Sequence, residues 1–270
     1  MSDIDPQAFS QFEHKGWQTI AARYHAAFAS ITTQAVAPLL DVAQVSEGTR
    51  MLDVASGPGY VASAATARGA VATGIDFSSE MVQEARGRYP GIDFREGDAE
   101  AIGFPDATFE AVVTNFGLLH LARPEQAIRE AYRVLRPGGR VAFTVWASPD
   151  KTLGFSIVLH AIQKYGDMNV PIPAGPPFFR FSDMEESRRL LAGAGFTRLV
   201  ITELPQVWQL SSPDVLFEVL YNASVRNAAL LRAQTPEVLD KIRAEVRTDV
   251  ERAGCRLPMP AVLAAGHKLR

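Results

Sequence analysis

The sequence predicts an α/β protein with a doubly wound, mostly parallel sheet, and three observations lead to this fold class. Between residues 50 and 146, short apolar runs alternate with amphipathic segments, as in parallel strands covered by helices on both faces. Gly57-Pro58-Gly59 interrupts the chain between the first apolar run and the first helical segment. The 270 residues, at roughly 150 residues per domain, correspond to about 1.8 domains, so we expect one large core with additions.

The elements are predicted in order along the chain. Apolar side chains at steps of three to five predict a helix over residues 7–31 and a second over 36–45. Strands are expected at 50–55, 70–75, 92–96, 109–114 and 140–146, and helices between them at 60–68, 79–88 and 124–135. Pro137-Gly138-Gly139 predicts a turn before the last of these strands.

After Trp146 the alternation ends. Five prolines between residues 149 and 181 predict that regular structure in this stretch is short. We then expect a helix at 182–194, with Asp183 and Glu185 in its first turn. A strand is expected at 196–204, and 207–210 would extend it. Helices over 213–254 would start at Pro213 and Pro236, and an edge strand would follow at 261–268.

Composition and charge exclude several classes of protein. Apolar residues make up 47% and charged residues 21%, which excludes a disordered or fibrous chain. A net charge of −3 is unlike the basic surface of a nucleic-acid binder. The single cysteine, Cys255, excludes an internal disulfide and a cysteine zinc site, and no set of histidines and carboxylates has metal-ligand spacing, so no metal is predicted. Without a signal peptide or an apolar run of about 20 residues, the chain is expected to be cytoplasmic, with no membrane span.

The glycine turn matches a dinucleotide-binding pattern only formally. Gly57, Gly59 and Ala62 satisfy G-x-G-x-x-A, and Asp76 lies 19 residues beyond Gly57. However, a carboxylate at Asp53, on the preceding strand, would repel a pyrophosphate.

Pro58 also removes a backbone N–H that would bind phosphate. These features favour a ligand with an ammonium group and no phosphates, which Asp53 would orient while Asp76 accepts hydrogen bonds from ribose hydroxyls. For an isolated aspartate a role as cap or turn residue is the better interpretation, but the positions of Asp53 and Asp76 at successive strand ends beside a glycine loop favour binding.

Five ordered blocks give the chain a family resemblance: LDVASGPGYVA, GIDFSSEMV, FREGDAEAIGFPDATFEAVV, NFGLLHL and RVLRPGGRVAFTVW. Together they resemble the class I S-adenosylmethionine-dependent methyltransferases, in the type 11 group that contains the ubiquinone/menaquinone-biosynthesis-like C-methyltransferases. The resemblance covers about residues 50–146. It implies a Rossmann-like, seven-stranded sheet with an antiparallel last strand, S-adenosyl-L-methionine as cofactor, and methyl transfer to a small molecule.

The resemblance also implies which residues bind the cofactor. Asp53, Ala55, Gly57 and Gly59 would line its methionine part, Asp76 its ribose, Phe77 and Met81 its adenine, Asp98 and Ala99 the adenine amino edge, and Asn115 the methyl group. Tyr24 resembles a lid residue, although packing in its helix explains it almost as well, and Asp98 could instead cap a turn. Ala55 stands where the family usually has its first glycine, and its methyl group is expected to be tolerated if φ there is not positive.

Methyl transfer needs a general base only when the acceptor must lose a proton. His120, in the loop after the fourth strand, is the candidate base, with a structural hydrogen-bonding role as the alternative. Predicted acceptor-binding residues are Trp17, Phe116, Trp146, Phe178 and Arg180, and further candidate lining residues are Phe155, Phe179, Phe181, Trp208, Phe217 and Tyr221, several of which must belong to the core.

The predicted organisation is a single domain. Residues 1–48 would form a helical cap, 49–148 the cofactor-binding core, 149–181 and 211–258 lid insertions over an acceptor pocket, and 182–210 with 259–270 the remainder of the sheet. The expected activity is methylation of a carbon or oxygen of a partly apolar small molecule by a monomer or homodimer. The alternatives are an NAD(P)-dependent oxidoreductase that uses the glycine loop and a cofactor-binding protein without catalysis.

Overall fold

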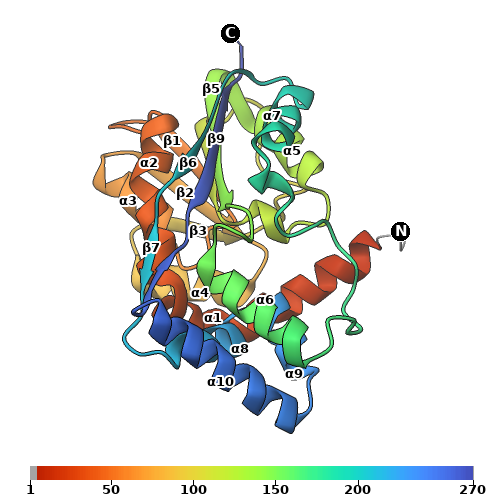
Figure 1. The fold of residues 1–270 in the computed structure, drawn as a ribbon. Helices are drawn as coiled ribbons and strands as arrows, with labels where there is room; N and C mark the ends of the chain where they lie inside the picture. Colours follow the sequence, from red (N-terminus) through yellow and green to blue (C-terminus); the bar gives the residue numbers. More distant parts are fainter. Residues whose placement is uncertain (1–4, 270) are drawn as a thin grey trace.

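The computed structural model describes residues 5–269, and Figure 1 shows its ribbon. Its helices are α1 (Pro6–Thr32), η1 (Thr33–Ala35), α2 (Val36–Val42), α3 (Tyr60–Ala67), α4 (Ser79–Arg88), η2 (Leu118–His120), α5 (Pro124–Val134), α6 (Leu153–Tyr165), η3 (Arg180–Ser182), α7 (Met184–Gly193), α8 (Val215–Ala223), α9 (Arg226–Arg232) and α10 (Pro236–Arg252). Its strands are β1 (Arg50–Val54), β2 (Val71–Asp76), β3 (Asp93–Glu96), β4 (Phe109–Asn115), β5 (Leu135–Trp146), β6 (Thr197–Leu204), β7 (Val207–Gln209), β8 (Arg256–Pro258) and β9 (Ala261–His267).

Seven strands form one sheet in the order β3-β2-β1-β4-β5-β9-β6. The pairs from β3 to β5 are parallel, whereas β9 is antiparallel to both of its neighbours. This confirms the predicted fold class, including the antiparallel last strand. The strand order reverses between β1 and β4, and ligands of open α/β sheets bind where such a reversal opens a crevice at the carboxyl ends of the strands.

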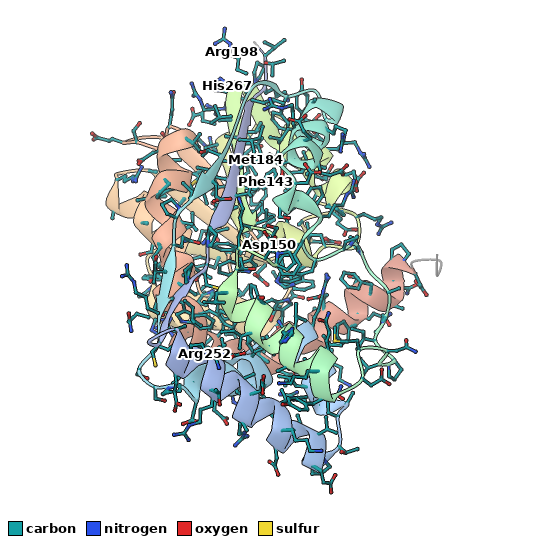
Figure 2. All side chains as sticks on the ribbon, in the orientation of Figure 1. Phe143, Asp150, Met184, Arg198, Arg252 and His267 are labelled. Atoms are coloured by element: carbon teal, nitrogen blue, oxygen red, sulfur yellow. The ribbon has the colours of Figure 1, made fainter. Side chains whose placement is uncertain are left out.

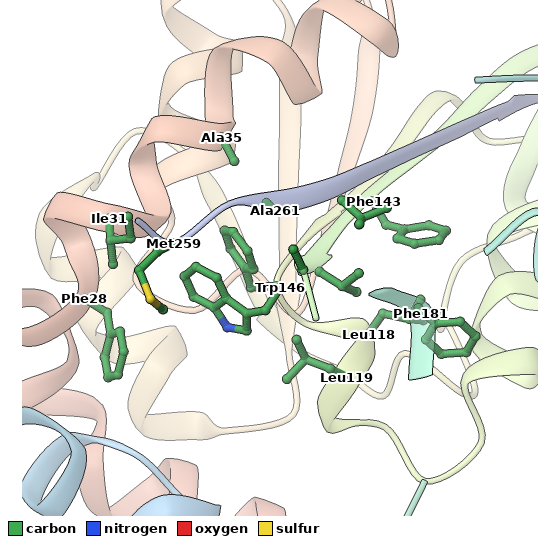
Figure 3. Packing of buried hydrophobic residues seen from close by; sticks show 14 of the residues in the cluster. Phe28, Ile31, Ala35, Leu118, Leu119, Phe143, Trp146, Phe181, Met259 and Ala261 are labelled. Carbon is green, nitrogen blue, oxygen red and sulfur yellow. The ribbon is translucent and has the colours of Figure 1, made fainter. Parts of the chain in front are cut away.

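The alternation of side chains along each strand divides the core into two apolar layers. Leu52 on β1 and Phe143 on β5 belong to the layer that also contains α5 and α6, while Met51 and Ala142 belong to the layer under α2 and α3. Because successive strand residues point to opposite faces, near-continuous apolar strands require helices on both sides of the sheet. Figure 3 shows the first layer, with Phe143 directed toward Phe181.

The additions to the core gather at one end of the molecule. In Figure 1, α1, α6, α8, α9 and α10 lie together at the end toward which β5 runs. The long helix α1 begins at the N-cap Asp5, whose carboxylate accepts hydrogen bonds from the backbone N–H groups of Gln7 and Ala8. These helices therefore cover the carboxyl ends of the parallel strands.

Four sequence predictions about elements are corrected. Residues 149–181 contain the 13-residue helix α6, because four of the five prolines fall at 171–177, after the helix has ended. Val207–Gln209 does not extend β6 but pairs with β8 in a separate two-stranded sheet. The helix expected at Pro213 begins at Val215. Pro137-Gly138-Gly139 lies within β5, where the ladder passes from Leu135 directly to Arg140.

Candidate functional site

A cavity lies at the carboxyl ends of β1, β2 and β4, beneath α1. The space between its walls, including the part open to solvent, is about 810 Å³. Of the residues predicted to bind cofactor or acceptor, the structure places these in its wall: Trp17, Tyr24, Asp53, Ala55, Gly57, Asp76, Phe77, Met81, Asp98, Ala99, Asn115, Phe116 and His120. Segments at the ends of four strands (β1, β2, β3 and β4) and the first helix therefore surround one space.

The glycine loop requires left-handed backbone at three positions. Gly57 has φ +50° and Gly59 has φ +86°, a conformation that costs glycine nothing. Ala55 has φ +54°, so the condition under which its methyl group was expected to be tolerated is not met. A left-handed alanine costs about 1 kcal/mol or more, which the surrounding strand ends must offset.

Gly59 does not line the cavity. It is the N-cap of α3, and a Cβ built there would lie 2.6 Å from the ring of Phe94. Position 59 therefore requires glycine because of its positive φ and its close packing against Phe94. At Gly57, in contrast, a built Cβ meets no atom within 4 Å, so the loop faces open space at this residue.

Asp76 joins the glycine loop to the next strand. Its carboxylate accepts hydrogen bonds from the backbone N–H groups of Gly57 (2.8 Å) and Ser78 (2.9 Å). Burial raises the pKa of Asp76 to about 6, against the lowering effect of these two bonds. Each oxygen keeps a lone pair, so the buried group can still accept hydrogen bonds from a ligand in the cavity.

Asp53 is the buried polar group with the clearest unfilled bonding capacity. It is fully buried, and one carboxylate oxygen accepts from the Ala62 N–H at 3.0 Å. The other, Oδ1, has no hydrogen-bond partner among the described residues, and neither does the hydroxyl of Ser56. Burial, with a contribution from Asp76, raises the pKa of Asp53 to about 8. An ammonium group donating to this oxygen would satisfy it, so the residues present fit a cofactor with an amino-acid end.

Helix α1 closes the opposite side of the cavity through contacts at the start of α4. The Gln18 side chain accepts from the Ser78 hydroxyl (2.6 Å) and from the Glu80 N–H (3.0 Å), and it donates to Ser79 (3.0 Å). His14 packs edge-to-face on Phe77, with ring centroids 5.4 Å apart. Sequence reasoning did not find Gln18, because a polar residue on an amphipathic helix carries no sign of its partner.

The remaining polar residues of the cavity wall already have protein partners. Asn115 donates to the carbonyl of Thr32 (3.0 Å) and accepts from the Thr144 hydroxyl (2.6 Å), which ties the end of β4 to the end of α1. Asp98 accepts from the Glu100 N–H at 2.8 Å, so it caps a turn and also lines the cavity. The two roles considered for Asp98 are therefore compatible.

A second, smaller cavity adjoins the first. Its empty volume is about 450 Å³, and it shares Trp17, Tyr24, Phe116 and His120 with the first cavity. The other lining residues are Phe28, Trp146, Phe155, Phe178, Ala223, Ser224, Val225, Arg226 and Asn227. The predicted helical cap (1–48) and both predicted lid insertions (149–181 and 211–258) contribute residues to this wall. The ends of β4 and β5 contribute the others.

Aromatic rings dominate the second cavity. Phe116 and Trp146 are stacked, with ring centroids 4.0 Å apart, and Phe116 has a left-handed backbone with φ +56°. Figure 3 shows the indole of Trp146 between Met259 and Leu119. Since Trp146 is only 5% exposed, it forms the floor of this cavity while belonging to the core.

Several residues expected at the acceptor pocket lie elsewhere. Arg180 lines neither cavity; its guanidinium pairs with Glu125 (2.7 Å) and Glu186 (3.1 Å) and lies over the ring of Phe181. Because protein carboxylates already occupy it, Arg180 is not placed to bind an acceptor. Five of the further aromatic candidates also line neither cavity and pack in or against the core: Phe179, Phe181, Trp208, Phe217 and Tyr221.

His120 lies in the wall common to both cavities and is held by residues that sequence reasoning missed. Its Nδ1 is 3.0 Å from a carboxylate oxygen of Glu13, which is fully buried, and Glu13 pairs with Arg226 at 2.6 Å.

Of the other histidines, His25 meets the Tyr60 hydroxyl at 2.9 Å, and Figure 2 shows His267 at the end of the molecule far from Arg252 on α10.

Within residues 5–269, no three or more His, Cys, Asp or Glu side chains are grouped so that they could hold a metal ion. Among the same described residues, no helix combines the length and apolar character that crossing a bilayer requires.

The structure defines an α/β protein with a cavity at the carboxyl ends of its parallel strands. Comparison with known proteins gives the class. A methyltransferase domain family matches residues 52–143. Demethylmenaquinone methyltransferase of Clavibacter sepedonicus is 32% identical over 183 residues, which cover 61% of this chain and 69% of the relative. The ubiquinone/menaquinone biosynthesis C-methyltransferase of Geotalea daltonii is 32% identical over 168 residues, covering 54% of this chain and 70% of that protein.

Solved structures agree on the fold. Phosphoethanolamine N-methyltransferase 2 of Haemonchus contortus superposes with a TM-score of 0.60 at 19% identity, covering 98% of this chain and 61% of that one. The Bacillus protein YcgJ superposes with a TM-score of 0.57 at 16% identity, covering 88% and 99%. Other demethylmenaquinone methyltransferases match more locally; this chain spans 47% of the relative from Renibacterium salmoninarum and 38% of that from Chlorobaculum parvum.

The chain belongs to the class I S-adenosylmethionine-dependent methyltransferases, in the ubiquinone/menaquinone-methyltransferase-like group. The predicted enzyme class, its cofactor S-adenosylmethionine and its action on a small molecule are thereby confirmed. The comparisons do not favour the alternatives of an NAD(P)-dependent oxidoreductase or an inactive cofactor-binding protein.

Proposed function

We propose that this methyltransferase acts on a ring carbon or a hydroxyl oxygen of a planar, hydroxylated aromatic molecule of the quinol type, with His120 as general base. The observation that carries the proposal is the place of His120 in the wall shared by the two cavities. A base at that junction can reach an acceptor proton beside the site of methyl transfer. The names of the relatives, demethylmenaquinone and ubiquinone/menaquinone methyltransferases, support an acceptor of this class.

The first cavity would hold S-adenosylmethionine. In this proposal, Asp53 Oδ1 accepts a hydrogen bond from the ammonium group, and the backbone at Ala55 and Gly57 lies along the methionine chain. Asp76 accepts from the ribose hydroxyls. Phe77, Met81, Asp98 and Ala99 surround the adenine, and Tyr24 and Asn115 lie toward the methyl group. The unpartnered buried oxygen of Asp53 is the main support, since a buried acceptor without a partner is costly.

The second cavity would hold the acceptor. The stacked rings of Phe116 and Trp146 offer a flat apolar surface. The aromatic wall around it is completed by Trp17, Tyr24 and Phe178. Aromatic rings pack well in offset-stacked and edge-on arrangements, which favours a planar acceptor. We also propose that residues 1–48, 149–181 and 211–258 act as cap and lid, because each supplies part of this wall.

The polar groups of the second cavity argue against a phosphorylated acceptor such as the one bound by the Haemonchus enzyme. Arg226 is the cavity's arginine, and its guanidinium already donates to Glu13 and to the carbonyls of Pro176 and Leu119. A phosphate would have to compete with a buried carboxylate for this cation. An uncharged or weakly acidic hydroxyl suits the site better.

The cofactor supplies a methyl group already activated on a sulfonium, so the protein's tasks are alignment, exclusion of water and removal of a proton. His120 would take the hydroxyl proton of the acceptor on Nε2, since Nδ1 faces Glu13. The resulting phenolate is a nucleophile at oxygen and at the ring carbon beside it. If the new bond forms at carbon, the proton on that carbon must also leave before aromaticity is restored.

The test is a transfer assay with S-adenosylmethionine and reduced naphthoquinols and benzoquinols that carry short prenyl tails. We expect a product heavier by one methylene group, with His120→Asn lowering its rate by about a hundredfold or more. Binding of S-adenosylhomocysteine, measured by calorimetry, should be unchanged in this variant. If quinols and simple phenols give no product while amine acceptors do, the proposal is wrong.

A further inference from the structure

One buried carboxylate, that of Glu13, connects the candidate base His120 on η2 to helices α1 and α9. Glu13 on α1 is fully buried, although it lies 107 residues from His120 and 213 from Arg226 on α9. Its Oε2 is 3.0 Å from His120 Nδ1 and accepts from Trp17 Nε1 at 3.1 Å. Its Oε1 accepts from Arg226 Nε at 2.6 Å. Three segments that are remote in sequence thus meet at one side chain.

The bonding pattern determines the tautomer of His120. An ionised carboxylate only accepts hydrogen bonds, so the proton of the 3.0 Å contact must reside on Nδ1 of the imidazole. In the neutral ring, Nε2 is then the nitrogen with a free lone pair. Edge-on contacts from Trp17 (4.7 Å) and Phe178 (5.8 Å) hold the ring in this orientation.

Arg226 keeps the carboxylate ionised in its buried position. Burial by itself raises the pKa of Glu13, but the neighbouring His120 and Arg226 outweigh it and hold that pKa below its usual value. Arg226 is itself fixed: it donates to the carbonyls of Leu119 (2.8 Å) and Pro176 (3.2 Å), and it lies over the rings of Phe9 and Phe178. The guanidinium has few degrees of freedom left.

We infer that Glu13 is a positioning residue that, held by Arg226, fixes the proton of the neutral His120 ring on Nδ1 and directs the lone pair of Nε2 toward the acceptor. The inference rests on the proposed function of His120 as base and adds a requirement to it: the base is set only when α1 and α9 are both docked. Gly16 shows how tightly they dock, because a Cβ built on it would lie 2.5 Å from a methyl group of Val225. The contact between α1 and the start of α9 therefore also completes the catalytic group.

The first test is Glu13→Gln. Substitution of a residue that orients a functional imidazole typically costs about 10- to 100-fold, and we expect a loss of that size in kcat. The affinity for S-adenosylhomocysteine and the KM for S-adenosylmethionine should stay within about twofold. Glu125→Gln is the matched control: it also removes one carboxylate that pairs with an arginine, Arg180, away from both cavities, and it should leave kcat unchanged.

A second variant separates positioning from folding. Glu13→Gln leaves the Arg226 cation without its buried partner, so the melting temperature should fall. In Glu13→Gln/Arg226→Met the cation is also gone, and the methionine can keep the apolar contacts with Phe9 and Phe178. Stability should recover while kcat at saturating acceptor stays low. Recovery of kcat together with stability would mean that Glu13 is only structural.

A spectroscopic test needs no acceptor and therefore stands apart from the proposed activity. Nitrogen-15 NMR of the histidine side chains, with His120→Asn to assign the signals, should show Nδ1 protonated and Nε2 unprotonated in the neutral ring of the native enzyme. Glu13→Gln should give a mixture of tautomers. A native neutral ring with its proton on Nε2 rather than Nδ1 overturns the inference. The expected tautomer without quinol methylation leaves the positioning role intact and rejects only the acceptor.

Discussion

The side chain of Ala55 fills the space beside Gly117. A Cβ built on Gly117 would lie 2.6 Å from the Cβ of Ala55 and 2.6 Å from the hydroxyl of Thr114. The left-handed Ala55 at the end of β1 and the chain after β4 therefore accommodate one another, because the absence of one side chain gives room for the other. The alanine that replaces the expected glycine is tolerated through this pairing.

Gly117→Ala should consequently destabilise the protein. Forcing a methyl group into a packed site typically costs about 1–3 kcal/mol, which denaturant unfolding would detect. Adding Ala55→Gly should restore part of this loss, since it removes one of the two close contacts and the strain of the left-handed alanine. Gly87→Ala is the control, because a Cβ there meets no atom within 4 Å and alanine favours the helix. Equal effects of the two glycine substitutions would contradict the pairing.

Cofactor affinity should depend on pH through Asp53. Its pKa in the free protein is raised to about 8, chiefly by burial, while binding an ammonium group requires the ionised form. Affinity for S-adenosylhomocysteine should therefore rise as pH increases from about 6 to about 8, by up to roughly tenfold per unit, with proton release on binding. Calorimetry in buffers of different ionisation enthalpy measures both, and Asp53→Asn should bind weakly with a flatter pH dependence.

The free protein should show the opposite trend in stability. Because the folded-state pKa of Asp53 lies above the usual value of 3.8, the folded chain binds more protons than the unfolded chain between pH about 4 and about 8. This contribution to the unfolding free energy is therefore present at low pH and is lost as pH rises toward 8. Denaturant unfolding across this range should show that the unfolding free energy of Asp53→Asn depends less steeply on pH than that of the native protein. An equally steep dependence would mean that groups other than Asp53 cause the trend.

Gly16→Ala should loosen the cap. Alanine would favour helix α1 by up to about 1 kcal/mol, but its methyl group would lie 2.5 Å from the Val225 side chain, and we expect the clash to prevail. The KM for acceptor should rise several-fold. Val225→Ala in the same chain should reverse the effect by making room, and failure of this rescue would show that α1 and α9 are not coupled in this way.

Arg180→Ala should leave methyl transfer within about twofold of the native rate. Its ion pairs with Glu125 and Glu186 involve partly exposed side chains, so the stability cost should stay below about 1 kcal/mol. Phe178→Ala, two residues away and in the wall of the second cavity, should instead raise the acceptor KM. A large rise for Arg180→Ala would restore the role predicted for it from sequence.

What the sequence determined by itself is the fold class and the outline of the first cavity. Asp53 and Asp76 follow from local pattern, because the carboxyl ends of parallel strands come together at one edge of the sheet, whereas Asn115 was expected only from the family resemblance. The glycine loop is equally local. Helix α6 was not predicted because the prolines at residues 171–177 indicated that regular structure is short in the whole stretch from residue 149, whereas they all follow the helix.

Tertiary structure alone decided the conformation of Ala55 and the surroundings of His120. The methyl group of Ala55 has room because residue 117 is a glycine. The orientation of His120 depends on Glu13 and Arg226, which look like ordinary charged residues of amphipathic helices. Their partners lie more than one hundred residues away. Local periodicity reports which face of a segment is buried, but it carries no information about which distant side chain that face will meet.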